Sequence, residues 1–135
     1  MILRVLGALT ALVLVVNGLR MLFEPEGWYQ SIPSVPHTGP FNVHFVRDIG
    51  CAYLAAALGA ALAVWRQPWC VPAGVVALTF LGLHAGVHLW EAATGHASAA
   101  YAGVIDTVGV YAPPVVLLLL IVFAFRQNSA EGGLR

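Results

Sequence analysis

Four long apolar runs dominate the chain, and short polar or proline-rich segments separate them. A helix needs roughly 20 apolar residues to cross the hydrocarbon core of a membrane. Each run reaches that length, so the pattern predicts membrane-spanning helices at about residues 2–23, 41–65, 69–91 and 103–125. The predicted fold class is all-α: a polytopic membrane protein with one antiparallel four-helix bundle, followed by a short tail at residues 126–135.

The composition agrees with a membrane protein and excludes other classes. The chain is 60 % hydrophobic and 9 % charged, whereas a soluble domain has an apolar share nearer half. The first apolar run is longer than the core of a signal peptide, and no A-x-A-like cleavage site follows it. We therefore expect it to be kept as a helix. The net charge of zero provides no basic surface for nucleic acid.

The connections between the spans predict loops and an orientation. Residues 24–40 contain four prolines, which favours an ordered or semi-extended loop over a helix, and residues 66–68 predict a tight turn. An excess of arginine marks the cytoplasmic side of membrane proteins, and four of the six arginines, Arg4, Arg66, Arg126 and Arg135, lie on the side of both termini. We expect both termini to be cytoplasmic and residues 24–40 to face the outside, which in a bacterium is the periplasm.

Polar residues form two stripes on the predicted spans. At about 100° per residue, the second span carries one narrow stripe of His44, Asp48 and Cys51, with Arg47 to its side. The third span carries an equally narrow stripe of His84, His88 and Glu91. Because the two spans are antiparallel, both stripes should lie at the same depth near the outer face. Asp106 lies near the start of the fourth span, in the same layer.

Polar residues inside a membrane usually face the bundle interior and bind one another or a ligand, so these stripes predict a polar cup open to the outside. Two imidazoles at positions i and i+4 can bind one metal ion, and histidine with carboxylate suits copper, zinc or iron. The shallow depth makes haem the lesser prediction. The predicted metal ligands, with carboxylates that could support them, are His44, Asp48, His84, His88, Glu91 and Asp106. Arg47 and Asp48 are the candidate catalytic residues.

Three functions follow from this cup. The first is a metal site for redox or metal-handling chemistry. The second is an accessory or assembly subunit, in which Arg47–Asp48 and Arg20–Glu24 pairs form a structural polar network. The third is the binding or transport of a small molecule, although the inner half offers no polar path across the membrane. The lipid bilayer is the expected partner, and a homo-oligomer or a larger membrane complex is compatible with each function.

Several other features make weaker predictions. His37 and His96 lie in predicted loops and are expected to be solvated. Gly82 and Gly86 form a small-xxx-small face that predicts close helix packing. Two adjacent prolines, Pro113–Pro114, predict a kink in the fourth span that frees nearby carbonyls. Cys51 and Cys70 are predicted at different membrane depths, which argues against a disulfide.

The opening segment "LRVLGALTALVLVVNGLRMLFEP" places an arginine before a glycine-containing apolar helix that ends in a proline-marked loop. In this and in its four-span layout the chain resembles the DoxX-like group of small bacterial membrane proteins. The resemblance implies a four-helix bundle in a bacterial inner membrane. The group is functionally diverse, so the resemblance implies little about chemistry, and the segments "HFVRDIG" and "HAGVHLWE" match none of its motifs.

Overall fold

The structure is a computed structural model that describes residues 1–95 and 106–132, and every regular element in this part of the chain is helical. Its long helices are α1 (Ile2–Phe23), α3 (Val43–Trp65), α4 (Gln67–Thr94) and α6 (Ala112–Gly132). Four helical segments are long and apolar enough to cross a membrane, the fourth of them running from Thr107 to Gln127. The predicted all-α membrane bundle of four spans is confirmed.

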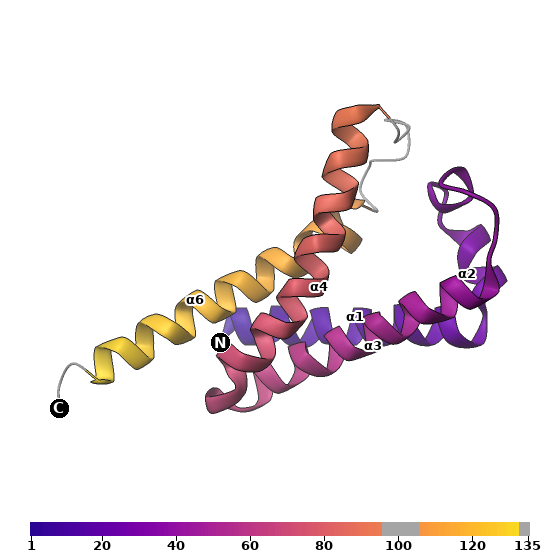
Figure 1. The fold of residues 1–135 in the computed structure, drawn as a ribbon. Helices are drawn as coiled ribbons and strands as arrows, with labels where there is room; N and C mark the ends of the chain where they lie inside the picture. Colours follow the sequence, from indigo (N-terminus) through magenta and orange to yellow (C-terminus); the bar gives the residue numbers. More distant parts are fainter. Residues whose placement is uncertain (96–105, 133–135) are drawn as a thin grey trace.

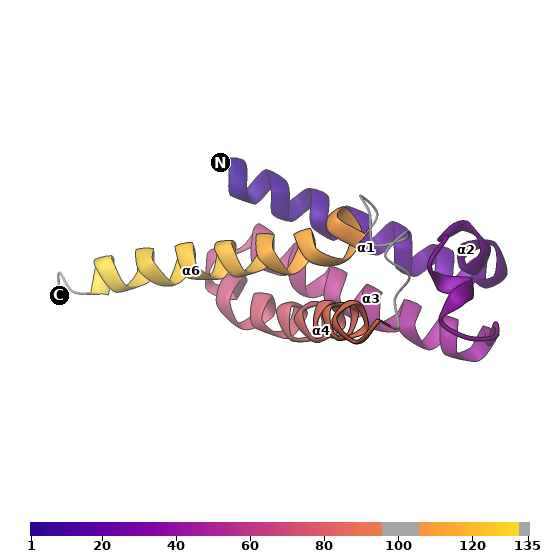
Figure 2. The same ribbon diagram turned by 90° about the horizontal axis from the view of Figure 1, so that it is seen from above.

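The four long helices pack in a ring, in which α1 and α4 each contact both α3 and α6. The start of α1 and the end of α6 lie at the same end of the bundle as the turn between α3 and α4 (Figures 1 and 2). We call the opposite end, where α1 ends and α3 begins, the α2 end. In Figure 1, α4 starts beside α3 and leaves it at an angle, so that its last turns stand apart from the α1–α3 pair.

The connection between α1 and α3 is more ordered than its prolines predict. It contains a short helix, α2 (Pro25–Ser31), and a 3₁₀ turn, η1 (Val35–His37). The expectation that this connection has no helix is wrong, because Pro25 occupies the first helical turn, where proline is well tolerated. The Trp28 indole donates a hydrogen bond of 2.8 Å to the Asn17 side-chain oxygen. This bond fixes α2 against α1 over the α2 end.

The turn between α3 and α4 is confirmed as tight. Arg66 alone separates the two helices, in an extended conformation, and proline in the first turn of α4 helps to start that helix. Just before the two prolines, where the sequence predicts a kink, the helix is π-helical over η2 (Thr107–Tyr111), which leads directly into α6. Here the Ala112 amide donates to the Thr107 carbonyl, a wider turn than in an α-helix. The start of the predicted fourth span, at residues 103–105, lies outside the described residues.

Small residues bring α3 close to both of its neighbours. A Cβ atom added to Gly50 would lie 2.9 Å from Met21 Cβ and 3.0 Å from the Gly18 carbonyl oxygen, so α1 and α3 touch through backbone. The predicted close packing at Gly82 and Gly86 is wrong, because a Cβ atom added at either position would meet nothing within 4 Å. Leu81 and Ala85 in the same stretch of α4 are buried, so these glycines lie on the side of α4 that faces away from its neighbours.

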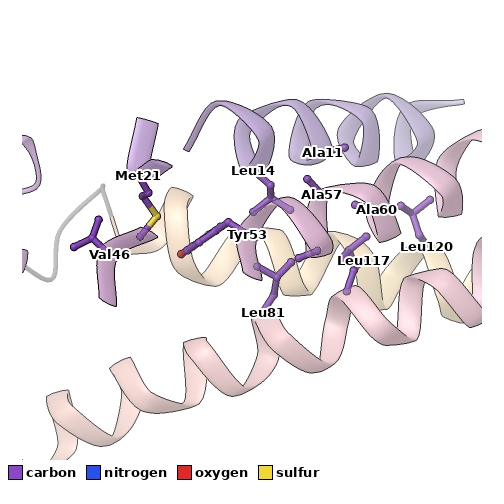
Figure 3. Packing of buried hydrophobic residues seen from close by; sticks show 12 residues of the cluster. Ala11, Leu14, Met21, Val46, Tyr53, Ala57, Ala60, Leu81, Leu117 and Leu120 are labelled. Atoms are coloured by element: carbon purple, nitrogen blue, oxygen red, sulfur yellow. The ribbon is translucent and has the colours of Figure 1, made fainter. Parts of the chain in front are cut away.

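The core lies along the inner faces of the four helices. Leu14, Leu81 and Leu117 from three helices are at most 2 % exposed and belong to one cluster with Tyr53 of α3 (Figure 3). The Tyr53 hydroxyl points toward Met21, at the α2 end of this cluster (Figure 3). A polar atom therefore reaches from the apolar core toward the α2 end, where the candidate site lies.

Candidate functional site

A cavity of about 800 Å³ opens at the α2 end, between the α1–α3 connection and the diverging end of α4. Its volume falls within the usual range for sites that bind small molecules. One wall consists of residues from α2, η1 and the loop after η1, and another of the α3 residues Phe45, Val46 and Ile49. The α4 wall presents His84, Val87, His88, Trp90 and Glu91, and Asp106 lies beside it.

Four side chains form a polar row that runs from the core to this cavity. The Tyr53 hydroxyl is hydrogen-bonded to His84 Nε2 at 3.0 Å. The rings of His84 and His88 meet edge to face, with centroids 4.8 Å apart. His88 Nδ1 lies 3.5 Å from an Asp106 carboxylate oxygen, and Asp106 is only 8 % exposed. We call these four residues the Tyr53–Asp106 row.

Aromatic packing holds the inner part of this row in place. The Phe80 ring stacks on His84 at an interplanar angle of 13° and a centroid distance of 5.9 Å. Tyr53 meets the edge of Phe80 with ring centroids 5.3 Å apart. Since each ring contacts the next and Tyr53 is 7 % exposed, the row presents a preformed polar edge to the cavity. Such pre-organisation reduces the entropy that is lost when a ligand binds.

The stripe on α4 lies where the sequence predicts it. His84, His88 and Glu91 all line the cavity, because their stripe continues the inner face that Ala77 and Leu81 bury further down α4. Asp106 joins them from the segment that leads into α6. Four of the predicted site residues are therefore brought to one cavity.

The stripe on α3 does not join them, and the prediction that it faces the bundle interior is wrong. His44 and Asp48 form their own ion pair at 3.3 Å, with side chains 85 % and 61 % exposed, and neither lines the cavity. The physical reason is the rotation of α3. Gly50 must face α1 at the close approach, and at about 100° per residue this turns His44 and Asp48 to the far side. Cys51 on the same stripe is exposed as well.

Arg47, the second candidate catalytic residue, also lies away from the cavity. Its Nε atom donates a hydrogen bond of 3.2 Å to the Leu22 carbonyl at the end of α1. The predicted Arg47–Asp48 pair is therefore not formed, and Arg47 does not line the cavity. The predicted pair of Arg20 with Glu24 does occur, with its charged atoms 4.0 Å apart.

The predicted metal site gains no support from this arrangement. Within residues 1–95 and 106–132, no three histidine, cysteine or acidic side chains are grouped closely enough to hold a metal ion. His84, His88 and Asp106 lie in a row, so they do not surround a common point. The metal hypothesis stays a prediction. Both loop histidines were expected to be solvated. His37 instead lines the cavity, and His96 lies outside the described residues.

The sequence reasoning missed the inner end of the row. Tyr53 is the one polar side chain on the face of α3 that otherwise presents Gly50, Ala56, Ala57 and Ala60 to the bundle. A tyrosine hydroxyl needs a hydrogen-bond partner when it is buried. Its position on a small-residue face was a signal for an inward polar contact.

Glu91 differs from the other carboxylate of the cavity. Asp106 has His88 as a partner, whereas Glu91 makes no ion pair and no side-chain hydrogen bond to any of the described residues. It is partly buried and lies near the end of α4. None of the described arginines lines the cavity, and the chain has no lysine. The described cavity wall therefore has acidic groups and no permanently basic one.

Comparison with known proteins provides no relative from which a function could be transferred. A scan against protein-family models, a search of curated proteins and a search of solved structures each find no match. The resemblance to DoxX-like proteins stays a prediction. The function is therefore inferred from the chemistry of the cavity.

Proposed function

We propose that this protein binds a lipophilic small molecule in the cavity at the α2 end. The observation that carries the proposal is the cavity itself: about 800 Å³, with apolar walls and a row of polar groups along one edge. Ligand sites of this kind bury an apolar body and orient it through a few polar groups. Here His84, His88 and Asp106 provide the polar edge.

The position of the cavity supports a ligand that enters from the membrane or its surface. The cavity lies at the end of helices that are apolar enough to span a bilayer, and the last turns of α4 diverge from the bundle beside it (Figure 1). Lipophilic molecules concentrate in the bilayer, so a site at this depth could take them directly from lipid.

We also infer an orientation in a bacterial inner membrane, with both termini in the cytoplasm and the cavity toward the periplasm. The end that carries both termini is marked by Arg4, Arg66 and Arg126, as expected of a cytoplasmic side. Arg4 donates a hydrogen bond of 2.7 Å to Gln67 at this end. Trp65 and Trp69 lie beside it, as expected of residues at a membrane surface.

Filling the cavity should release its ligand. Val87 lines the cavity, so the larger indole of a Val87→Trp variant should occupy part of the space and exclude the ligand. We expect a lipophilic compound in organic extracts of the purified wild-type protein, detected by mass spectrometry, and a loss of at least about tenfold in the variant. Tenfold corresponds to about 1.4 kcal/mol.

The matched control is Val76→Trp, also on α4 and also exposed, but outside the cavity lining. It should retain the compound at the wild-type level. If folded wild-type protein contains no compound above the level of Val87→Trp, ligand binding is contradicted and an accessory or assembly role becomes the better account.

A further inference from the structure

We infer that the cavity selects a lipophilic cation, such as a protonated amine or a quaternary onium ion, over an anion. The inference rests on the proposed function and adds to it the charge of the ligand. It follows from three features of the described cavity wall: an acidic side chain without a partner, the absence of arginine, and several aromatic rings.

The first feature is the charge of the wall. Glu91 is partly buried at the end of a membrane helix and has no cationic partner among the described residues. A carboxylate near lipid is costly unless an opposite charge neutralises it. The other carboxylate of the wall, Asp106, lies 3.5 Å from His88 Nδ1 and so has a partner. A cationic ligand would supply the charge that Glu91 lacks.

The second feature is the aromatic lining. Trp28, Tyr29, Phe45 and Trp90 all line the cavity, and they come from three helices and from both of its sides. Aromatic rings attract cations through their π-electrons, most strongly when both are shielded from water. Trp28 and Tyr29 are held in place by hydrogen bonds to Asn17 and to the Gly39 carbonyl. These rings offer apolar contact to the body of the ligand and electrostatic attraction to its charge.

An anion finds no comparable partner. Anion sites in proteins rely on arginine, lysine or helix N-termini, and no described arginine lines this cavity. The end of α4 that borders the cavity is a helix C-terminus, where the dipole is negative. The remaining basic groups of the wall are the imidazoles of His37, His84 and His88, which carry no permanent charge.

Two nearly isosteric probes test this inference: tetraphenylphosphonium, a cation, and tetraphenylborate, an anion. Binding to the full-length protein in detergent at pH 8 is measured by equilibrium dialysis. Subtracting the binding to Val87→Trp removes partition into the micelle. We expect tetraphenylphosphonium to bind at least about tenfold more tightly than tetraphenylborate. Glu91→Gln should weaken binding of the cation about tenfold without weakening the anion.

The matched control is Glu26→Gln, which removes an exposed carboxylate of α2 that does not line the cavity and should leave the affinity for the cation unchanged. Equal affinity for the two ions, tighter binding of the anion, or no effect of Glu91→Gln would overturn the inference. If extraction nevertheless finds a compound that depends on Val87, ligand binding stands and only charge selection fails. If nothing is extracted and neither ion binds wild type above Val87→Trp, both proposals fail.

Discussion

Replacing Gly50 with leucine should strongly destabilise the bundle, because Gly50 lies where α1 and α3 touch. The added Cβ atom would lie 2.9 Å from Met21 Cβ and 3.0 Å from the Gly18 carbonyl oxygen, and backbone cannot move aside as a side-chain end can. Helices α1 and α3 would have to separate. We expect a loss of about 3 kcal/mol in the free energy of unfolding in detergent, the upper part of the range for overpacking.

Gly82→Leu is the control, because a Cβ atom at Gly82 meets nothing within 4 Å. The free energy of unfolding of this variant should lie within about 0.5 kcal/mol of the wild-type value, as for most changes at open positions. A greater loss at Gly82 than at Gly50 would mean that α4 packs through the small-residue face that the sequence suggested.

The second large effect concerns the pair of His88 and Asp106. Their side chains are 25 % and 11 % exposed, and removing one member of a buried pair leaves a polar group without a partner. We expect His88→Leu to lower the free energy of unfolding by about 3 kcal/mol, as for other broken buried pairs. Replacing both residues with leucine should restore most of this loss, because the Asp106 carboxylate is then removed together with its partner. Chemical unfolding in detergent measures both variants.

His44→Leu is the matched control, since His44 also pairs with an aspartate, Asp48, but both side chains are largely exposed. Pairs of that kind contribute at most about 1 kcal/mol. If His88→Leu and His44→Leu lowered the free energy of unfolding equally, the His88–Asp106 pair would not be the buried pair that the structure describes.

The spans could be predicted from the sequence because they depend on length and hydropathy alone. Helix α1 has the predicted bounds, residues 2–23. Helix α3 begins two residues later than predicted and ends at the predicted Trp65, while α4 begins two residues earlier and ends three residues later than predicted. The short helix α2 could not be predicted from proline content. Proline interrupts a helix when it lies in the interior of the helix, but it favours a helix when it lies in the first turn. The number of prolines alone therefore does not decide between a loop and a helix.

The α4 part of the site could be predicted from the sequence and the α3 part could not, because the rotation of each helix decides which residues face inward. On α4 the polar stripe shares its face with Ala77 and Leu81, so placing the histidines inward was correct. On α3 the rule that polar residues face inward conflicted with a second feature. The small residues around Gly50 form a face that lies opposite His44. Close backbone packing decided the rotation and left the polar stripe outside. Reading the small-residue face first would have placed Tyr53 inside and His44 outside.

Photolabelling tests the central claim most directly. A neutral lipophilic diazirine probe is irradiated with the protein in native membranes, with and without excess unlabelled probe, and the labelled residues are mapped by mass spectrometry. We expect labelling of the cavity residues Val87 and Trp90 to fall under competition, because their site saturates, while labelling of Val76 outside the cavity persists as for any lipid-facing side chain. A binding site at the α2 end would be contradicted if excess unlabelled probe reduced the labelling of none of these residues, or reduced it equally at all of them.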